Sequence, residues 1–411
     1  MTFQPPKGTR DFFPEDMAVR HHIDAAWRRA SIRSGFDEIE GPTFEHLDLY
    51  QVKSGEGIVS ELFSFRRSGG ETDYALRPEF TPTLARMAAA KGRSLSLPTK
   101  WFAIPSHFRA ERPQRGRLRE FRQWNVDLLG VDSPSADAEV IATAVAALAD
   151  LGLTPEDVVV RISHRDVAAR LLQESGVAES ALSDAFDLLD RRDRITDSEA
   201  RAAAIGLDLA SFDEAVAGAG DDPGLATLQA ELDRWGVGQW CRFDFSTVRG
   251  LAYYTGVVFE IHTVGGDERA IAGGGRYDGL VELFGGPSMP AVGFGMGDVV
   301  LGLLLKDKGL VADDRSLLPR PDAFVISSGG DADHAVVPLV AALRSAGLHA
   351  RMSYRATRNI GKLLTEASKV NARFAVILGD GAADGMSQVK NLDSGVQEPV
   401  AINDIPAFID H

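Results

Sequence analysis

Hydrophobic and polar residues alternate with a period of two in two stretches that enclose a short arginine-rich segment. In the first stretch, Phe102, Ile104 and Phe108 fall on one face, and Arg109 and Glu111 fall on the opposite face. Because successive side chains of a strand point to opposite sides, this alternation predicts a β-strand with one apolar and one polar face.

The second stretch predicts a partner strand with the same division. Its apolar face consists of Trp124, Val126 and Leu128. Its opposite face carries an aromatic residue and three polar ones, namely Phe121, Gln123, Asn125 and Asp127. A half-buried hairpin would present small solvated polar residues on that side. This mixture instead indicates a pocket for a zwitterionic substrate together with a polyphosphate.

The rest of the pattern predicts an antiparallel α+β sheet with flanking helices. Helices are expected after Pro14, from Pro82, over residues 136–152, and throughout a helical insertion at about 166–236. A hairpin that turns at Gly69 and Gly70 is expected within residues 61–77. Further strands are expected over residues 158–163, 242–245, 253–264 and 291–297, with a glycine-rich turn at 273–275. Grouped strands with helices around them favour α+β over repeated βαβ units.

A second domain is expected at the C-terminal end of the chain. Residues 318–322 contain two prolines and indicate a linker after a first domain of residues 1–317. Residues 323–411 then alternate strands with helices and finish in a polar hairpin, which is typical of a small α/β domain.

Composition narrows the kind of protein. With 411 residues and 44% hydrophobic residues, the chain can form two or more well-packed domains. The single cysteine, Cys241, rules out a disulfide framework and a multi-cysteine zinc site, and the nine histidines show no metal-ligand spacing. No apolar run approaches the ~18 residues of a membrane helix, and the N-terminus lacks an apolar signal core. We expect a cytoplasmic protein without a membrane partner.

Charge is distributed unevenly along the chain. The net charge is −15, and residues 171–235 alone hold fifteen acidic and five basic side chains. Residues 109–122, in contrast, hold six arginines and two glutamates. Such a cationic segment can be a solvated hairpin tip, or it can contact phosphates through guanidinium groups that bind bidentately. A nucleic-acid partner therefore stays possible in spite of the acidic total.

The arginine-rich segment also carries a family resemblance. The sequence FRAERPQRGRLREF (108–121) resembles motif 2 of class II aminoacyl-tRNA synthetases in the form found in histidyl-tRNA synthetases. Other segments resemble that family in the same order, namely KGTRDFFPED (7–16), GFDEIEGPTFE (35–45), ALRPEFTPTLAR (75–86), TVRGLAYYTGVVFE (247–260) and GGGRYDGL (273–280). The last two are similar to the histidine-specific signatures, and the resemblance covers nearly the whole chain.

The resemblance implies a histidine–tRNA ligase that uses ATP with Mg2+ and charges tRNA(His). It implies catalytic roles for Arg109 and Arg249. The implied ATP-binding residues are Arg109, Glu111, Arg117 and Phe121. The implied L-histidine-binding residues are Glu79, Thr81, Gln123, Asp127, Arg249, Tyr254 and Tyr277. Gln114 and Arg115 match positions near the acceptor end of the tRNA, although a solvated turn is an equally simple interpretation for both.

The same resemblance assigns the domains and an assembly. Residues 1–317 correspond to the class II catalytic domain and residues 323–411 to an anticodon-binding domain. Residues 35–45 resemble motif 1, with Pro42 at the position that lies in the dimer interface of the family, which implies a homodimer. The glycines at 273–275 can form a tight turn, or their missing side chains can let the backbone approach a ligand.

Several positions depart from the usual family pattern. Asp127 stands where glutamate is usual, and Ala252 replaces an aspartate. Motif 3, GFGMGDVVL (293–301), has Val300 where the family places an ATP-binding arginine, and Asp298 opens the following helix. The spellings RGLAYYTG and GFGMGD are similar to those of organelle-type histidyl-tRNA synthetases of plants. This similarity favours an active enzyme in which another cation or helix N-terminal amides serve the phosphates.

Two other functions stay open at the level of sequence. The first is a non-charging paralogue, such as the regulatory subunit of ATP phosphoribosyltransferase, and the second is an enzyme that transfers an aminoacyl group to a small molecule. Neither needs residues 320–411, and decayed motif 2 arginines are typical of the first. The chain has residues 320–411 and retains the motif 2 arginines, so we favour the synthetase.

Overall fold

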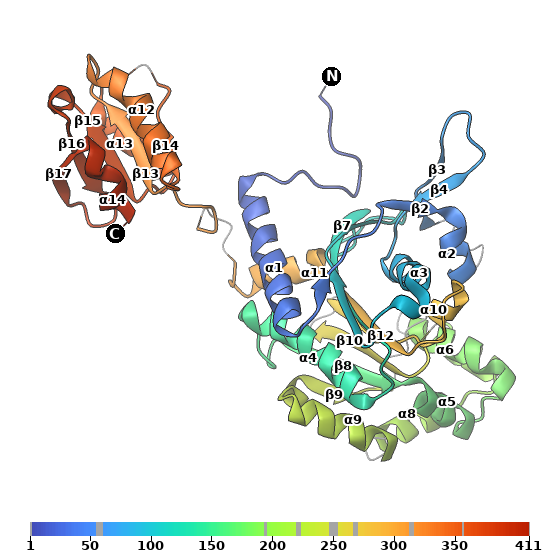
Figure 1. The fold of residues 1–411 in the computed structure, drawn as a ribbon. Helices are drawn as coiled ribbons and strands as arrows, with labels where there is room; N and C mark the ends of the chain where they lie inside the picture. The colour runs from blue at the N-terminus through green and yellow to red at the C-terminus, as the bar shows by residue number, and fades with distance from the viewer. Residues whose placement is uncertain are drawn as a thin grey trace. The chain divides into compact units, whose positions relative to one another are not determined.

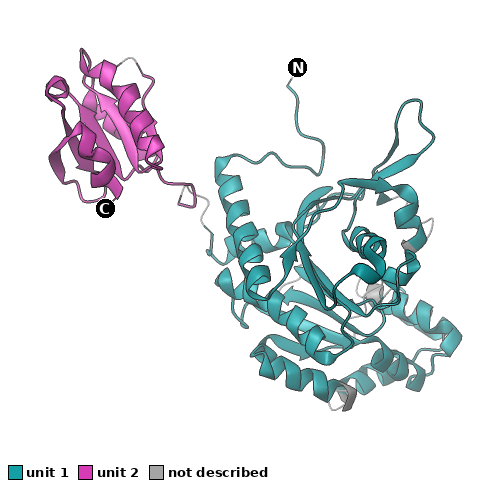
Figure 2. Ribbon diagram, viewed as in Figure 1, with its two compact units in different colours: residues 1–313 teal, residues 314–411 magenta. Residues whose placement is uncertain are grey.

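The computed structural model describes residues 2–54, 61–192, 195–218, 223–245, 254–265, 270–311, 316–355 and 357–410. The chain divides into two compact units, residues 1–313 and residues 314–411 (Figure 2). Within the described ranges, no helix combines the length and the apolar character that a membrane crossing requires.

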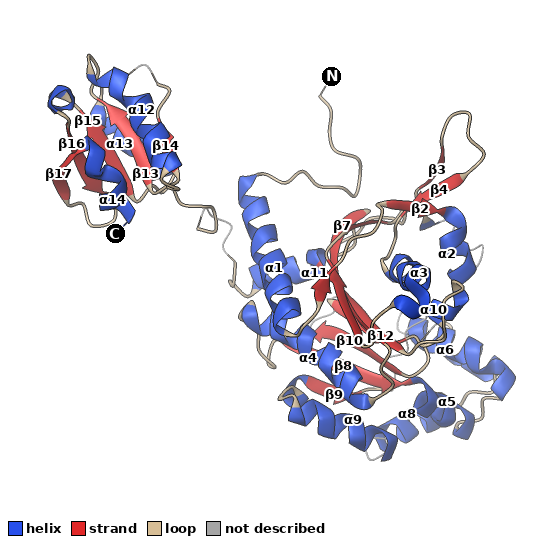
Figure 3. Ribbon diagram, viewed as in Figure 1, coloured by secondary structure: helices blue, strands red, loops and turns tan. Residues whose placement is uncertain are grey.

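A mostly antiparallel sheet, with nine strands among the described residues, forms the centre of the first unit (Figures 1 and 3). Its strands in spatial order are β1 (Asp37–Glu38), β5 (Thr99–Ala103), β7 (Glu120–Leu129), β12 (Ala291–Gly297), β11 (Ala272–Arg276), β10 (Val257–Thr263), β8 (Val158–His164) and β9 (Cys241–Phe243). The strand β6 (Ser106–Phe108) pairs with the first part of β7. Only β1–β5 and β8–β9 are parallel among these pairs, so the predicted α+β architecture is confirmed.

Three helices pack on one face of this sheet, namely α1 (Pro14–Arg33), α4 (Pro134–Asp150) and α11 (Asp298–Asp307) (Figure 1). Helix α1 begins at a proline, and Asp16 accepts a hydrogen bond from the Phe13 amide, as suits a helix N-terminus. The fully buried indole of Trp124 stacks on Trp27, with 6.0 Å between ring centroids. The apolar face of β7 therefore meets these helices, and its polar face points away from them.

Shorter elements lie beyond the opposite face and beside it. Helix α3 (Thr81–Lys91) contacts α10 (Leu280–Leu283), and Phe80, Leu84 and Leu280 are buried in a shared cluster. Helix α2 (Leu47–Ser54) adjoins a small antiparallel sheet with the order β2 (Phe44–His46), β4 (Asp73–Leu76), β3 (Ser64–Arg66). Strands β3 and β4 confirm the hairpin predicted within residues 61–77, and Gly69 in its turn has φ +76°.

The acidic segment forms a helical layer with its own apolar core. Its helices are α5 (Arg165–Glu174), α6 (Leu182–Arg191), α7 (Ser198–Ala204), α8 (Leu209–Gly218) and α9 (Pro223–Arg234). Leu172, Phe186 and Phe212 are buried among them, while α9 contacts α4. The segment predicted as a helical insertion at about 166–236 thus contains these five helices within its described residues.

The second unit contains a separate sheet with the order β14 (Ala350–Met352), β13 (Ala323–Ser327), β15 (Phe374–Leu378), β16 (Met386–Asn391), β17 (Gln397–Ala401). Strands β13, β14 and β15 are parallel, and the polar hairpin β16–β17 is antiparallel. The helices α12 (Ala332–Ser345), α13 (Ile360–Lys369) and α14 (Ile405–Asp410) complete the unit. Its buried residues form their own clusters, which include Val325, Leu343 and Val376.

The glycine-rich turn predicted at residues 273–275 is wrong. These glycines lie in the middle of β11, hydrogen-bonded between β10 and β12. A β-carbon on Gly274 would lie 2.3 Å from the carbonyl oxygen of Gly293, and one on Gly275 would lie 2.6 Å from that of Val257. Close approach of neighbouring chain segments, rather than a positive φ, therefore requires glycine here.

The first alternating stretch also differs from the prediction. It is not one strand, because β5 ends at Ala103 and β6 begins at Ser106, with Pro105 between them. Phe102 and Ile104 are buried as expected, but Phe108 is half-buried, and His107 is fully buried. A proline lacks the amide hydrogen that a continuous ladder needs, which explains the break.

Candidate active site

The polar face of β7 lines a cavity of about 80 Å³. The lining comes from the start of α3, the end of β6, and strands β7, β11 and β12, and it consists of Glu79, Thr81, Arg109, Gln123, Asn125, Tyr254, Gly273, Tyr277, Gly293, Phe294 and Gly295. Six residues that the sequence assigns to substrates are thereby brought together, namely Glu79, Thr81, Arg109, Gln123, Tyr254 and Tyr277.

Glycines of β12 make room for the long side chains of β7. A β-carbon on Gly293 would lie 2.1 Å from Oδ1 of Asp127, and one on Gly295 would lie 2.5 Å from Nε2 of Gln123. The side chains of Asp127 and Gln123 therefore lie over the neighbouring strand. The alternating glycines of GFGMG are the sequence signal for this arrangement, and the sequence analysis did not assign them to the site.

Asp127 is held beneath the cavity wall by a hydrogen bond. It is only 3% exposed, and the Tyr277 hydroxyl donates to its Oδ1 over 2.5 Å. Burial raises the pKa of Asp127 to about 7, although the hydrogen bond from Tyr277 opposes that rise. Tyr277 lines the cavity and Asp127 does not, so among the described residues Asp127 reaches the cavity through the phenol.

Arg109 is fixed by its surroundings. Its Nε donates to the Pro78 carbonyl over 3.1 Å, and its Cζ lies 5.1 Å from the centre of the Phe121 ring. The ring of His107 also stacks on Phe121, with 5.6 Å between centroids. Complete burial, and then the charges of Arg77 and Arg109, hold the pKa of His107 well below its usual range. A neutral imidazole thus packs in a cationic environment.

The remaining residues of the expected ATP set lie outside this cavity. Glu111 and Arg117 form an ion pair with each other. The backbones of Gln114 and Arg117 exchange two hydrogen bonds of 3.0 and 2.9 Å, and Gly116 between them has φ +74°. The loop between β6 and β7 is therefore a tight turn with a positive φ that suits glycine.

Gln114 and Arg115 line a different cavity, of about 410 Å³, that the N-terminal segment, α1 and α11 also border. Arg115 lies 3.6 Å from Asp307 and is largely exposed. Gln114 and Arg115, the two residues expected near tRNA, therefore line the same cavity, and neither lines the cavity that contains Gln123.

Val300 is buried in the first turn of α11, against the β6–β7 loop. A β-carbon on Gly116 would lie 3.3 Å from its Cγ2. Asp298, at the start of the same helix, accepts a hydrogen bond of 2.7 Å from Nη2 of Arg10 and one of 2.9 Å from the Arg122 amide. Val300, at the motif 3 position, thus makes an apolar contact with the loop. Arg10 places a cation at Asp298, two residues earlier in the same helix. Arg249 and Ala252 fall within residues 246–253, which are outside the described residues.

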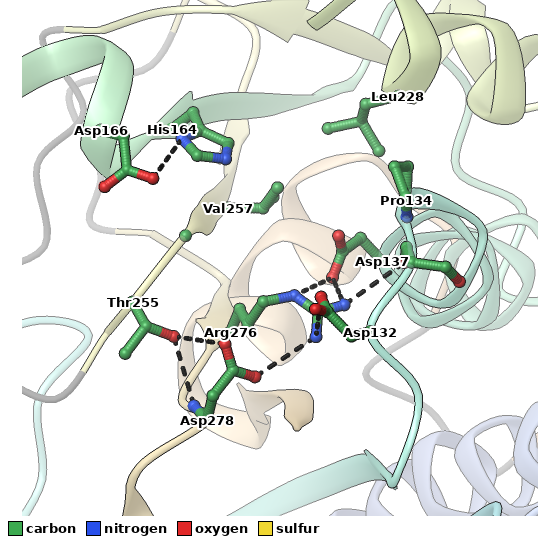
Figure 4. A pocket seen from close by; sticks show the side chains of 12 residues that line it. Asp132, Pro134, Asp137, His164, Asp166, Leu228, Thr255, Val257, Arg276 and Asp278 are labelled. Atoms are coloured by element: carbon green, nitrogen blue, oxygen red, sulfur yellow. Dashed lines mark hydrogen bonds and ion pairs between the residues drawn. The ribbon is translucent and has the colours of Figure 1, made fainter. Parts of the chain in front are cut away.

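Arg276 directly follows the three glycines of β11, but its side chain does not line the same cavity as the side chain of Tyr277. Its Nη2 donates to Asp137 of α4 over 2.7 Å, and its Nη1 donates to Asp278 (Figure 4). The Nη1 also donates to the Val131 carbonyl. It lines a separate cavity of about 240 Å³. Burial raises the pKa of Asp137 to about 6 and outweighs the opposing effect of Arg276. The pair links β11 to α4.

The described residues contain no group of three or more His, Cys, Asp or Glu side chains that could hold a metal ion. Asn125 and Phe294 also line the cavity beside β7, and the sequence did not assign either of them to a substrate. Asn125 could have been found, because it alternates with Gln123 and Asp127 on the polar face of β7.

The chain is similar to known proteins over nearly its full length. The family model described as histidyl-tRNA synthetase matches residues 8–297, and the model described as anticodon binding domain matches residues 322–411. A histidine–tRNA ligase of Halobacterium salinarum is 40% identical and is covered over 97% of its length by 98% of this chain. A chloroplastic/mitochondrial histidine–tRNA ligase of Arabidopsis thaliana is 37% identical, with 98% of this chain and 85% of that protein covered.

A crystal structure of histidyl-tRNA synthetase from Nostoc sp. PCC 7120 superposes with a TM-score of 0.81 at 25% identity. The superposition covers 100% of this chain and 99% of that one. Because a family model matches most of the chain and relatives above 30% identity span it, the protein belongs to the histidyl-tRNA synthetase family.

Proposed function

We propose that the protein is a histidine–tRNA ligase, which activates L-histidine with ATP and transfers the histidyl group to the 3′ end of tRNA(His). The cavity beside β7 carries this proposal. It places a carboxylate, Glu79, and a guanidinium, Arg109, around a site that the Tyr277–Asp127 pair adjoins. These groups complement the ammonium, the carboxylate and the imidazole of histidine.

In the first step, a carboxylate oxygen of histidine attacks the α-phosphorus of ATP, and the bond to pyrophosphate breaks. Negative charge develops on the phosphate oxygens, and Arg109 stabilises it from a fixed position. Its Nε bond to Pro78 holds the guanidinium in place before the reaction. Arg249 serves as the second cation in this proposal. In the second step, the ribose hydroxyl of the tRNA attacks the carbonyl carbon of the adenylate and releases AMP.

ATP binds at Phe121, Glu111 and Arg117 in this proposal. Phe121 stacks on the adenine, Glu111 accepts from its amino group, and Arg117 contacts the outer phosphates. Glu111 and Arg117 form an ion pair with each other in the structure, and ATP would replace it. Mg2+ enters with ATP and is held chiefly by its phosphates.

The ring of histidine lies toward Tyr277, Tyr254 and the Asp127 carboxylate. Glu79 pairs with the ammonium, and Thr81 and Gln123 complete the amino-acid site. A site that pairs both ring nitrogens discriminates strongly, because an amino acid without them leaves buried polar groups unpaired.

The tRNA contacts both units in this proposal. Gln114 and Arg115 approach the acceptor end, and residues 323–411 read the anticodon. The match of residues 322–411 to an anticodon-binding model supports the second contact. A cytoplasmic location accompanies the proposal, since the substrates of translation are found there.

The enzyme acts as a homodimer through the motif 1 region in this proposal. Buried Arg77 donates to the carbonyls of Gly41 and Pro42 over 2.8 and 3.2 Å and so fixes that segment. Phe44 and Phe65 next to it are 48% and 43% exposed, and their rings are 5.6 Å apart. An exposed aromatic cluster beside a rigid segment suits a subunit interface.

Histidine-dependent exchange of pyrophosphate into ATP tests this function. We expect exchange with L-histidine and none with the other protein amino acids, together with charging of a tRNA(His) transcript. Absence of exchange with every amino acid would favour the non-charging paralogue. Exchange without charging would restrict the enzyme to adenylate formation.

A further inference from the structure

The two tyrosines of the proposed histidine site are connected through the residues that follow them. Tyr254 and Tyr277 line the cavity beside β7, whereas the next residues, Thr255 and Asp278, line the separate cavity of about 240 Å³. Figure 4 shows Thr255 and Asp278 joined to each other by hydrogen bonds. Because consecutive residues of an extended segment point to opposite sides, this contact fixes the main chain from which the two phenols extend.

The hydroxyl of Thr255 makes two hydrogen bonds to Asp278. Its Oγ1 donates to Oδ2 of the carboxylate over 2.9 Å and accepts from the Asp278 amide over 3.2 Å. A hydroxyl can donate and accept at the same time, so one small group binds both the side chain and the main chain of Asp278. The Thr255 amide also donates to the Arg276 carbonyl over 2.9 Å. These hydrogen bonds join residue 255 to residues 276–278.

Asp278 is itself attached to the centre of the sheet. Its Oδ1 accepts from the Ala291 amide over 3.0 Å and from Nη1 of Arg276 over 3.3 Å. Ala291 is the first residue of β12, which lies between β7 and β11. The shorter of the two hydrogen bonds comes from Ala291, so the main chain of a central strand is the principal anchor of this carboxylate.

The two tyrosines differ in the contacts that hold their rings. The Tyr277 hydroxyl donates to the buried Asp127. The ring of Tyr254 lies against the main chain of β11, because a β-carbon on Gly275 would lie 2.8 Å from Cδ1 of that ring. Gly275 offers the ring a surface without a side chain that would limit its movement along the strand. The position of the Tyr254 phenol therefore depends on the adjacent main chain, which Thr255 holds.

On the basis of the proposed function, we propose that Thr255 is a positioning residue for histidine binding. Through its two hydrogen bonds to Asp278, it holds Tyr254 at a fixed separation from Tyr277, so that both phenols reach the bound amino acid together. Thr255 does not contact the substrate in this proposal, since it lines the second cavity. A site whose side chains are ordered before the substrate arrives loses less affinity to the ordering of those side chains.

Thr255→Val tests the proposal, because valine keeps the branched shape and removes both hydrogen bonds of the hydroxyl. Thr255 is exposed, so we expect the variant to fold. In pyrophosphate exchange, the KM for histidine should rise about 5- to 20-fold, as for the loss of two hydrogen bonds, and the KM for ATP should stay within about twofold. Thr255→Ser keeps the hydroxyl and should stay within about twofold in both. Equal rises in the two KM values would overturn the proposal.

A second pair of variants tests whether Thr255 acts through Tyr254. Tyr254→Phe removes the phenol hydroxyl whose position is at issue. In the Tyr254→Phe background, Thr255→Val should then change the KM for histidine by no more than about twofold, because two residues that act through one contact are not additive. A rise as large as in the unmodified background would overturn the proposal, since Thr255 would then act by another route.

Thr154→Val is the matched control. The Thr154 hydroxyl also donates to an aspartate, Asp157, over 2.9 Å, and Thr154 is exposed in the first unit and lines neither cavity. This variant should leave both KM values within about twofold. If Thr255→Val behaves like this control, the role of Thr255 is refuted and the proposed function stands. If the unmodified protein shows no exchange with histidine, the proposed function is refuted, and the role of Thr255 with it.

Discussion

The Tyr277 hydroxyl donates a 2.5 Å hydrogen bond to the Asp127 carboxylate, although 150 residues separate them in the sequence. Asp127 lies on β7, and Tyr277 directly follows β11. The strand β12 lies between them in the sheet, and only the missing side chain of Gly293 lets the carboxylate extend across it. One glycine therefore permits the contact that defines the inner end of the proposed histidine site.

Tyr277→Phe should weaken histidine binding while it preserves the shape of the cavity. The change removes the donor and leaves a buried carboxylate without a partner, which costs about 1–3 kcal/mol. We expect the KM for histidine in pyrophosphate exchange to rise about 10- to 100-fold, with a nearly unchanged KM for ATP. Tyr354→Phe, at a tyrosine that is 87% exposed in the second unit, is the control. An unchanged KM for histidine in Tyr277→Phe would remove the phenol from the site.

The raised pKa of Asp127 predicts a pH-dependent contribution to stability. In the unfolded chain the carboxyl ionises near pH 4, but in the folded protein its pKa is about 7. The folded state therefore binds more protons between these values, and its stability falls as pH rises through this range. Below pH 4 both states are protonated, and the contribution is fully present.

Asp127→Asn tests this dependence, because it cannot ionise. All five tryptophans lie in residues 1–313, so their fluorescence follows unfolding of the first unit in urea. The stability of the unmodified protein relative to Asp127→Asn should decrease by about 2–3 kcal/mol between pH 5 and pH 7.5. Parallel curves for the two proteins would mean that Asp127 ionises normally in the folded state.

Arg109→Ala should lower the rate of adenylate formation at least ~100-fold, as expected for removal of one fixed group that stabilises developing charge. Arg109→Lys should recover little, because an ammonium cannot reproduce the planar fork. Arg112→Ala is the control, since Arg112 is exposed in the same arginine-rich loop. Single-turnover measurement of adenylate formation separates this effect from product release. Near-normal rates in Arg109→Ala would exclude Arg109 from the reaction.

The period-two pattern predicted the active face of β7 well, for a physical reason. Side chains of a strand alternate strictly, so the polar set that includes Gln123 and Asp127 had to share one face. That face could be located without knowledge of its neighbours. Asn125 belongs to the same set, so the alternation that located Gln123 also placed Asn125 on the face that lines the cavity.

Other features of the fold depend on contacts between segments that are distant in the sequence. The local pattern of hydrophobic and polar residues carries no information about such contacts. Glycines at 273–275 are compatible with a turn and with a crowded central strand, and the close approach of β10 and β12 decides between them. The ion pair of Arg10 with Asp298 joins residues 288 positions apart. The same limitation explains why Arg276 could not be separated from Tyr277 by sequence, although the two adjacent side chains serve different regions.

Arg276 should prove essential for stability. Its guanidinium is 7% exposed and pairs with an Asp137 carboxylate that is 6% exposed, so Arg276→Met leaves a buried carboxylate unpaired (Figure 4). We expect a loss of about 3–5 kcal/mol in the unfolding free energy measured by tryptophan fluorescence. The double variant Arg276→Met/Asp137→Leu should recover most of this loss.

The same variants test whether Arg276 contacts a substrate. At a temperature where Arg276→Met remains folded, KM values for histidine and ATP should stay within about threefold of the unmodified enzyme. A large rise in either KM in the stable double variant would contradict a purely structural pair and would place Arg276 in the site with Tyr277.

Removal of residues 320–411 should separate the two steps of the reaction. Each of the two units has its own buried apolar clusters. Adenylate formation by the remaining chain should therefore stay within about fivefold of the full protein. Charging of tRNA(His) should fall by about 100-fold or more, because the tRNA loses one of two linked contacts and with it the gain from simultaneous binding. Pyrophosphate exchange and charging, measured on one preparation, provide the comparison, and the melting temperature of the first unit is the control for folding. Equal losses in both reactions would mean that the second unit supports the fold of the first rather than the binding of tRNA.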